Sequence, residues 1–247
     1  MLTESELERY NRQMLISNWG KQGQIKLKEA KVVVAGVGGL GCPVSLYLTA
    51  TGVGTIHLID KETFELSNLN RQILGYQNDI GKRKVDAARE KLVALNSDIN
   101  IITNCVTITK DNVHELIEGY DIVVDAMDNW KTRFLLNQAC VKEQIAFIHA
   151  GIYGWSGQMT TIVPGKGPCL RCIIPRNPPE MKSFPVIGAT PGFFATLQVM
   201  EVIKLCTAIG EPLIGRLLIF DGEDFNVSVV NVSRNPNCPV CKDTAPL

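Results

Sequence analysis

The sequence predicts an α/β protein with a Rossmann-like sheet that is mainly parallel in its N-terminal half and is continued by antiparallel strands. In the first half, short apolar runs such as Lys31–Ala35 alternate with longer stretches of helical periodicity. This alternation is typical of a parallel sheet covered by helices on both faces. From Gly157 onward, strand-like segments are interrupted by a single long helical stretch, so we expect the second half of the sheet to be antiparallel.

The expected elements follow in chain order. The capping-box pattern Thr3-x-x-Glu6 opens an amphipathic segment and predicts an N-terminal helix over residues 3–18. In the parallel half we expect strands at 31–35, 55–60, 99–106, 121–125 and 145–149, and helices at 43–51, 82–95, 111–118 and 132–142. In the second half we expect strands at 158–164, 216–221 and 226–232, and a helix over 193–208.

Length and composition predict a single globular domain. Its 247 residues fit one domain over 1–247, divided into halves at 30–150 and 151–247. A hydrophobic fraction of 45% excludes a disordered chain. The 25 basic residues balance the 25 acidic ones, and this zero net charge argues against a general nucleic-acid binder. Because no apolar leader or bilayer-length run is present, we expect a soluble, cytoplasmic protein with no membrane partner.

A glycine-rich turn follows the first expected strand. Gly36, Gly38 and Gly41 match the dinucleotide fingerprint G-x-G-x-x-G, and Asp60 ends the next strand. Glycines let the backbone approach a phosphate, the helix N-terminus offers N–H donors, and the carboxylate accepts from ribose hydroxyls. The pattern predicts a nucleotide-binding half at 30–150 without identifying the nucleotide. No Walker motif occurs, which excludes a P-loop mechanism.

Charged residues follow successive strands of the predicted sheet. Ser67–Gln72 comes shortly after Asp60, Lys82–Lys84 opens the next helix, and Asp125–Asn129 follows the fourth strand. Arginine and lysine neutralise charge on a triphosphate, and a carboxylate at a strand end holds Mg²⁺. Ligands bind at the carboxyl ends of the strands in this architecture. The placement therefore favours chemistry on a nucleoside triphosphate over hydride transfer.

These motifs, taken together, resemble the E1-like adenylyltransferases of the MoeB/ThiF/HesA family. The resemblance covers nearly the whole chain in order, and it includes the two Cys-x-x-Cys pairs. The motifs that carry it are Arg9–Gln13, Gly36–Gly41, Leu58–Asp60, Ser67–Gln72, Gly81–Lys84 and Asp125–Asn129.

The resemblance implies ATP-dependent adenylation of the C-terminal glycine of a small ubiquitin-like sulfur carrier protein, with release of pyrophosphate. Such a carrier ends in Gly-Gly and serves molybdopterin or thiamine biosynthesis or a related sulfur-transfer pathway. The implied catalytic residues are Arg12, Arg71, Lys84 and Asp128, with Mg²⁺ on Asp128. Because Arg12 reaches the ATP of the other subunit in the family, a homodimer is implied as well.

The same resemblance implies the nucleotide contacts. Gly39 approaches the phosphates, Asp60 and Asn68 serve the ribose, and Arg71 and Lys84 bind phosphates. The whole implied set that binds the nucleotide is Gly36, Gly38, Gly39, Gly41, Asp60, Asn68, Arg71, Lys84, Asp128 and Asn129. The half at 151–247 is expected to bind zinc and the carrier.

Four paired cysteines predict a zinc knuckle. Cys169 and Cys172 form one Cys-x-x-Cys pair, Cys238 and Cys241 form the other, and proline or glycine flanks each pair. Four thiolates make a closed tetrahedral Zn²⁺ site, which leaves no position open for catalysis. A redox dithiol and unmetallated pairs are the alternatives.

The other cysteines and the histidines are expected to have structural roles. Some members of the family carry a cysteine in the crossover segment, which here is 176–185 and contains none. We therefore expect adenylation without a covalent thiol step, and we take Cys42, Cys105, Cys140 and Cys206 as buried small hydrophobes. The histidines fit no metal-ligand pattern and are assigned to core or surface positions: His57, His114 and His149.

Three alternative functions stay open from the sequence. One is an E1-like tRNA-modifying dehydratase, which the neutral charge disfavours. Another is a nucleotide-binding scaffold without turnover. A nicotinamide oxidoreductase is the weakest, because it leaves Arg71, Lys84 and Asp128 unexplained.

Overall fold

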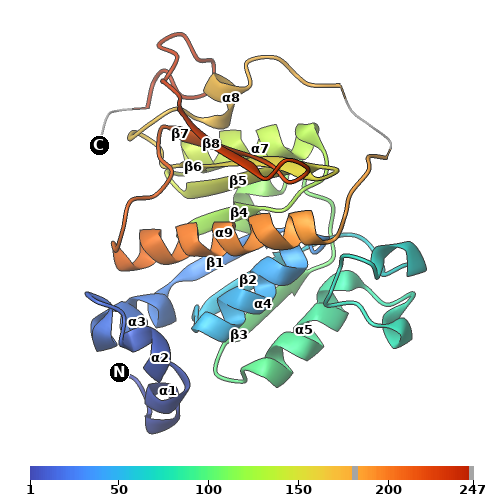
Figure 1. Ribbon diagram of the computed structural model, residues 1–247, viewed down its shortest axis with the longest axis vertical. Helices are drawn as coiled ribbons and strands as arrows, with labels where there is room; N and C mark the ends of the chain where they lie inside the picture. The colour runs from blue at the N-terminus through green and yellow to red at the C-terminus, as the bar shows by residue number, and fades with distance from the viewer. Residues whose placement is uncertain (180–182, 245–247) are drawn as a thin grey trace.

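The computed structural model describes residues 1–179 and 183–244, and within them a single eight-stranded sheet forms the centre of the molecule (Figure 1). Its strand order is β3-β2-β1-β4-β5-β6-β7-β8, parallel from β3 to β5 and antiparallel from β5 to β8. The mixed sheet that the sequence predicts is confirmed. The strands are β1 Lys31–Ala35, β2 Thr55–Ile59, β3 Asn100–Asn104, β4 Ile122–Asp125, β5 Ala146–Tyr153, β6 Ser156–Ile162, β7 Arg216–Asp221 and β8 Asn226–Asn231.

Helices cover both faces of the parallel part. On one face α9 runs beside α4, with α3 and α5 next to them, and α6 and α7 pack on the other face (Figure 1). The α-helices are α1 Glu4–Arg9, α2 Asn11–Met14, α3 Gly20–Glu29, α4 Gly41–Thr51, α5 Lys84–Leu95, α6 Val113–Ile117, α7 Trp130–Lys142, α8 Leu170–Ile173 and α9 Ala189–Thr207. Two short 3-10 helices, η1 Leu66–Asn68 and η2 Gln77–Asp79, lie between β2 and α5.

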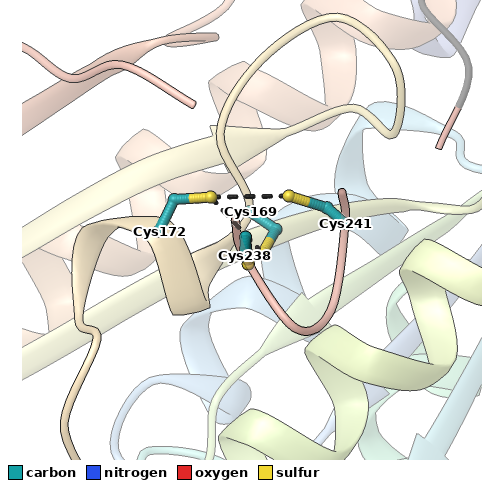
Figure 2. Close-up of side chains that lie close together, drawn as sticks. All are labelled: Cys169, Cys172, Cys238 and Cys241. Carbon is teal, nitrogen blue, oxygen red and sulfur yellow. Dashed lines mark hydrogen bonds between the residues drawn. The ribbon is translucent and has the colours of Figure 1, made fainter. Parts of the chain in front are cut away.

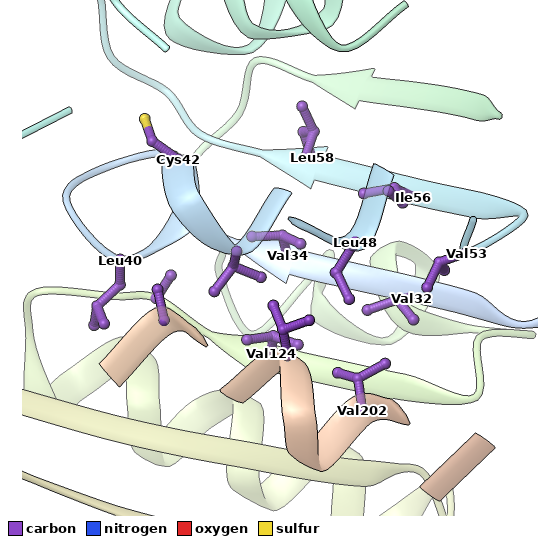
Figure 3. Packing of buried hydrophobic residues seen from close by; sticks show 14 of the residues in the cluster. Val32, Val34, Leu40, Cys42, Leu48, Val53, Ile56, Leu58, Val124 and Val202 are labelled. Atoms are coloured by element: carbon purple, nitrogen blue, oxygen red, sulfur yellow. The ribbon is translucent and has the colours of Figure 1, made fainter. Parts of the chain in front are cut away.

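The alternation of side chains along β1 divides the core in two. Val32 and Val34 face the layer of α4 and α9, where they pack near Leu48 and Val202 (Figure 3). Val33 instead belongs to the cluster on the opposite face, together with residues of α6 and α7. Successive side chains of a strand point to opposite faces of the sheet. The unbroken apolar run in β1 is therefore typical of a strand that is buried on both faces.

The N-terminal segment differs from the single helix expected over residues 3–18. It contains two short helices, α1 and α2, with Tyr10 as the C-cap of the first and the N-cap of the second. The Tyr10 side chain is buried, and its hydroxyl accepts a hydrogen bond from Asn96 Nδ2 at 2.9 Å. The tyrosine ring packs so closely on Gly52 that a Cβ there would lie 2.6 Å from it. This anchoring of Tyr10 accounts for the break.

The strand order places one crevice at the centre of the sheet. β1 lies between β2 and β4, so the chain leaves β1 to one side of the sheet and returns to the other side at β4. Ligands of open α/β sheets bind at such a switch point, outside the carboxyl ends of the strands. The glycine turn after β1 and the segment Ala126–Asn129 after β4 meet there. Within the described residues, none of the helices combines the length and apolar character needed to cross a membrane.

Candidate functional site

A cavity of about 480 Å³ lies at the carboxyl ends of β1, β2 and β4. Nine of the ten residues implied to bind the nucleotide line it: Gly36, Gly38, Gly39, Asp60, Asn68, Arg71, Lys84, Asp128 and Asn129. Gly41 and Arg12 are not among the lining residues of the described chain. The segment Ser183–Val186 contributes Ser183, Phe184 and Val186 to the cavity wall.

The glycines of the turn after β1 have two different roles. Gly36 has a φ of +99°, and a Cβ on it would lie 2.6 Å from the carbonyl oxygen of Ala126. A Cβ on Gly41 would lie 1.8 Å from the carbonyl oxygen of Gly36. These two glycines therefore allow the turn itself to close. Gly38 and Gly39 instead line the cavity, and a Cβ on Gly38 would have only Gln72 Nε2 nearby, at 3.9 Å.

Asp60 is fixed at the end of β2 by two backbone donors. Its Oδ2 accepts from Val37 N and its Oδ1 from Glu62 N, both at 2.8 Å. Burial raises the pKa of this carboxyl group, while the two backbone hydrogen bonds oppose that shift. The carboxylate is thus oriented toward the cavity beside the glycine turn, where a ribose hydroxyl donates to such a group in dinucleotide sites.

Arg71 and Lys84 are two of the cations that line the cavity, beside Lys61 and Arg133, and each of the two is held by neighbouring groups. Arg71 Nη1 donates to Ser67 O and to Asn70 Oδ1, both at 2.9 Å. The Lys84 side chain is buried and pairs with Glu62 at 2.7 Å, and Glu62 itself is half exposed. Arg71 thus lies in the loop after β2 and Lys84 at the start of α5, and both line the cavity where they can neutralise phosphate charge.

Lys82 is directed away from the cavity. It forms an ion pair with Asp79 at 3.0 Å and is absent from the lining of the cavity in the described chain. The two lysines of the run Lys82–Lys84 therefore have different roles. Lys84 begins α5 and points toward the cavity, whereas Lys82 anchors the preceding turn.

Asp128 and Asn129 follow β4 at the opposite wall. Asn129 is the N-cap of α7: its Oδ1 accepts from Thr132 N at 2.9 Å, and its Nδ2 donates to Asp128 Oδ1 at 3.2 Å. The Asp128 side chain is exposed to the cavity. Carboxylate oxygens are the donors that Mg²⁺ prefers, and Mg²⁺ is typically bound by one or two carboxylates together with substrate phosphates. The donor set at Asp128 fits this ion.

Arg12 lies on α2, exposed, at the N-terminal end of the fold. The two hydrophobic residues that follow the helix are exposed as well, Leu15 at 71% and Ile16 at 50%. The position of Arg12 in this chain does not bring it into this chain's own cavity.

The four paired cysteines form one cluster, although they come from distant parts of the chain (Figure 2). Their sulfur atoms all lie within 4.8 Å of one another. Cys169 Sγ is 3.6 Å from Cys238 Sγ, and Cys172 Sγ is 3.4 Å from Cys241 Sγ. Tetrahedral zinc, with Zn–S bonds of about 2.3 Å, needs sulfurs about 3.8 Å apart. The cluster can hold a metal ion, and its donors and spacing fit zinc.

Burial keeps three of the thiols outside this cluster, Cys42, Cys140 and Cys206, protonated at neutral pH. It raises the pKa of Cys42 and of Cys206 to about 12, and it raises the pKa of Cys140 as well. Cys42 and Cys140 are buried as expected, whereas Cys105 and Cys206 are partly exposed. Cys105 Sγ donates to Lys61 O at 3.7 Å.

A buried polar group beneath the cavity was not foreseen from the sequence. Asp125, at the end of β4, and His149, on β5, are both fully buried and joined by a 2.7 Å hydrogen bond. Arg133 of α7 lies 3.7 Å from the same carboxylate. The one sequence feature that could have revealed this contact is the pairing of the two predicted strands, because Asp125 and His149 are direct partners in the parallel register of β4 and β5.

The fold and the cavity together define a Rossmann-like nucleotide-binding protein that holds cations and a carboxylate at the carboxyl edge of its parallel strands. The particular family follows from comparison with known proteins. The model of the ThiF family matches residues 10–240, and the chain belongs to this family.

Curated relatives match the chain nearly from end to end. The chain is 41% identical over 245 residues to the SAMP-activating enzyme E1 of Haloferax volcanii, covering 97% of this chain and 90% of that protein. It is 39% identical over 251 residues to the sulfur carrier protein adenylyltransferase of Thermus thermophilus, covering 98% and 93%. The adenylyltransferase and sulfurtransferase MOCS3 of Culex quinquefasciatus is 42% identical over 253 residues, but the chain spans only 58% of its length.

A solved structure supports the fold. The crystal structure of E. coli MccB with ATP superposes with a TM-score of 0.84 at 30% identity, covering 98% of this chain and 76% of that one. These findings confirm the resemblance on which the sequence-based expectations rest.

Proposed function

We propose that this protein adenylates the C-terminal carboxylate of a small ubiquitin-like sulfur carrier protein at the expense of ATP and releases pyrophosphate. The observation that carries the proposal is the convergence of the glycine turn, Asp60, Arg71, Lys84 and Asp128 on one cavity. The printed names of the relatives, an activating enzyme and a sulfur carrier protein adenylyltransferase, support the same reaction class.

The chain's residues would divide the work as follows. The glycine turn and the N-terminus of α4 receive phosphates, and Asp60 and Asn68 orient the ribose. Arg71 and Lys84 neutralise the phosphate oxygens on which charge builds up. Asp128 would hold Mg²⁺, which when bound neutralises charge on the leaving pyrophosphate.

The reaction then needs no nucleophile from the protein. An oxygen of the carrier's terminal carboxylate forms a bond to the α-phosphorus, and the bond from that phosphorus to the bridging oxygen breaks, so that the electron pair leaves with pyrophosphate. Positioning and charge neutralisation are the main requirements of such a transfer. The raised pKa values of Cys42 and Cys206 mean that neither supplies a thiolate at neutral pH, which supports adenylation without a covalent step on these thiols.

The Gly-Gly tail of the carrier would enter beside Ser183–Val186. This segment is tied to the β5–β6 hairpin, because Gly154 N donates to Pro185 O at 2.8 Å and Thr190 Oγ1 donates to Gly154 O at 2.9 Å. Together the two segments wall one side of the cavity. The crossover residues 176–185, expected to lack a nucleophilic thiol, include 180–182, which lie outside the described residues.

We also propose that the protein works as a homodimer in which Arg12 serves the partner's ATP. Its exposed position, beside the exposed Leu15 and Ile16, supports a role across an interface. The chain would form a single domain, with its nucleotide half at 30–150 and its zinc- and carrier-binding half at 151–247.

Zinc in the cysteine cluster would have a structural role. Bound zinc would join the segment around Cys169 and Cys172 to the C-terminal segment around Cys238 and Cys241. The sulfur atoms of both pairs all lie within 4.8 Å of one another, which supports one closed four-thiolate site over a redox dithiol within either pair.

Pyrophosphate exchange into ATP tests the proposed reaction. The purified protein is supplied with Mg²⁺ and a panel of ubiquitin-like carriers with free Gly-Gly ends, and exchange is expected with one of them. Asp128→Ala should abolish it. Asp98→Ala is the matched control, because Asp98 is an exposed carboxylate before β3, at the opposite edge of the sheet. ATP binding without exchange for any carrier would contradict the proposal and favour a scaffold or an RNA substrate.

A further inference from the structure

In the buried group beneath the cavity, Asp125 and His149 are fully enclosed by the protein, and Arg133 separates them from the cavity that it lines. His149 Nδ1 is 2.7 Å from Asp125 Oδ2, and because a carboxylate only accepts, Nδ1 carries the proton. Trp130 covers the group, with its ring 5.9 Å from the His149 ring and 5.0 Å from the Arg133 guanidinium. Gly151 leaves room for the guanidinium, since a Cβ there would lie 2.9 Å from Arg133 Nη1.

This group fixes the peptide that precedes Asp128. Asp125 Oδ1 accepts from Met127 N at 3.0 Å, and Met127 O accepts from Arg133 Nε at 3.1 Å and from Nη2 of the same side chain. Both the N–H and the carbonyl oxygen of Met127 are therefore fixed by hydrogen bonds to side chains of the buried group. Asp128 is the next residue, so the direction of its carboxylate depends on these bonds.

Arg133 is shared between two acceptors. Its guanidinium bonds Met127 O but stays 3.7 Å from Asp125 Oδ2, which is too far for a hydrogen bond. The oxygen it does not reach is the one bonded to His149. Hydrogen bonds between charged groups are stronger than bonds to a neutral carbonyl. Without the His149 donor, the guanidinium would gain by moving onto Asp125 and releasing Met127 O.

His149 also keeps an unpartnered polar atom. Its Nε2 is buried and has no hydrogen-bond partner among the described residues. A buried polar atom without a partner is unfavourable, and an apolar side chain at this position would avoid the cost. Such an exception in the core is expected where a side chain serves the site.

We propose that His149 is a positioning residue for Asp128. By occupying Asp125 Oδ2, it keeps Arg133 on Met127 O and thereby holds the turn that aims the Asp128 carboxylate at the metal–nucleotide complex. The inference rests on the proposed function for the metal, but it concerns only this chain's residues. His149 itself does not line the cavity within the described chain and touches no substrate.

The test compares two substitutions in the full-length protein. His149→Leu removes the donor at similar volume, and His149→Asn restores an N–H near the place of Nδ1. Two readouts are taken: Mn²⁺ affinity of the protein–ATP complex by electron paramagnetic resonance, and the Mg²⁺ dependence of pyrophosphate exchange at saturating carrier. We expect His149→Leu to weaken Mn²⁺ binding and lower kcat by about 10–100-fold, with the KM for carrier unchanged, and His149→Asn to recover most of the loss.

The outcomes separate this inference from the proposed function. If the unaltered protein shows no pyrophosphate exchange, only the proposed function is contradicted, because the Mn²⁺ affinity of the protein–ATP complex still measures the effect of His149. Equal Mn²⁺ affinity in the unaltered protein and in folded His149→Leu overturns the inference, as does a folded His149→Asn as impaired as His149→Leu. If His149→Leu does not fold, Gly151→Ala takes its place, since its methyl group displaces Arg133; unchanged Mn²⁺ affinity in that variant overturns the inference too.

Discussion

Replacing Gly41 by alanine should disrupt the glycine turn from within the protein, before any nucleotide is involved. The new Cβ would lie 1.8 Å from the carbonyl oxygen of Gly36 and 2.8 Å from its carbon. Both contacts are to backbone, so no side chain can rotate away. The first turn of α4 and the end of β1 must separate by at least about 1 Å, and overpacking of this kind costs about 1–3 kcal/mol.

That cost predicts a measurable loss of stability. For a domain of this size each kcal/mol lowers Tm by about 2–4 °C, so Gly41→Ala should melt several degrees below the unaltered protein. Nucleotide binding should weaken as well, because the displaced α4 N-terminus no longer presents its N–H groups to a phosphate. Thermal unfolding by circular dichroism and ATP titration by calorimetry measure the two effects.

Gly38→Ala is the matched control in the same turn. Its φ lies outside the left-handed region and its new methyl group would meet only Gln72 Nε2, at 3.9 Å. Stability should stay the same or rise by up to about 1 kcal/mol, while ATP affinity falls because the methyl group enters the cavity. If Gly41→Ala keeps both its Tm and its ATP affinity, the packing argument for this glycine is wrong.

Three further predictions concern stability. Purified protein should contain about one equivalent of zinc per chain, and its removal by a strong chelator should lower Tm; a metal-free protein with the same Tm would contradict the structural role. Burial lowers the pKa values of His57 and His149, so the unfolded chain, with its ordinary pKa of about 6.5, binds more protons in acid. Stability should therefore fall as pH decreases through about 6.5, and urea unfolding curves that coincide at pH 7.5 and 5.5 would refute this. Gln198→Leu should cost about 1–3 kcal/mol, because Gln198 Nε2 donates to the buried carbonyls of Asp125 and Ile148 at 2.9 and 3.1 Å; an unchanged urea midpoint would show that neither bond matters.

The parts of the site that could be predicted from the sequence are those set by local chemistry. Gly36 needs a positive φ, and Asp60 follows directly on a buried strand. Strand ends of a parallel sheet lie at one edge, so placing Asp60 and Asp128 after their strands was enough to bring them to one cavity. No long-range contact had to be known in advance.

The parts that could not be predicted depend on contacts between distant segments. The break at Tyr10 arises from its packing on Gly52 and its bond to Asn96, none of which is visible in a helical pattern. Residue type and local spacing do not distinguish Lys82 from Lys84, and only the family resemblance assigned Lys84 to the phosphates; the turn before α5 directs Lys82 to Asp79 and Lys84 to the cavity. Helical periodicity carries no information about such partners.

One helix links the two functional regions of the chain. α7 begins at Trp130, and the side chain of its N-cap Asn129 lies at the cavity wall. Two turns further along, Asn137 Oδ1 accepts at 2.9 Å from the backbone N–H of Leu170, the residue after Cys169. The cysteine cluster is therefore attached to the same rigid element that carries the wall of the nucleotide cavity. Because α7 also packs on β4 and β5, the sheet holds it in place independently of the metal. Metal removal should consequently loosen α8 and the C-terminal segment first, and it should reduce thermal stability before it reduces ATP affinity.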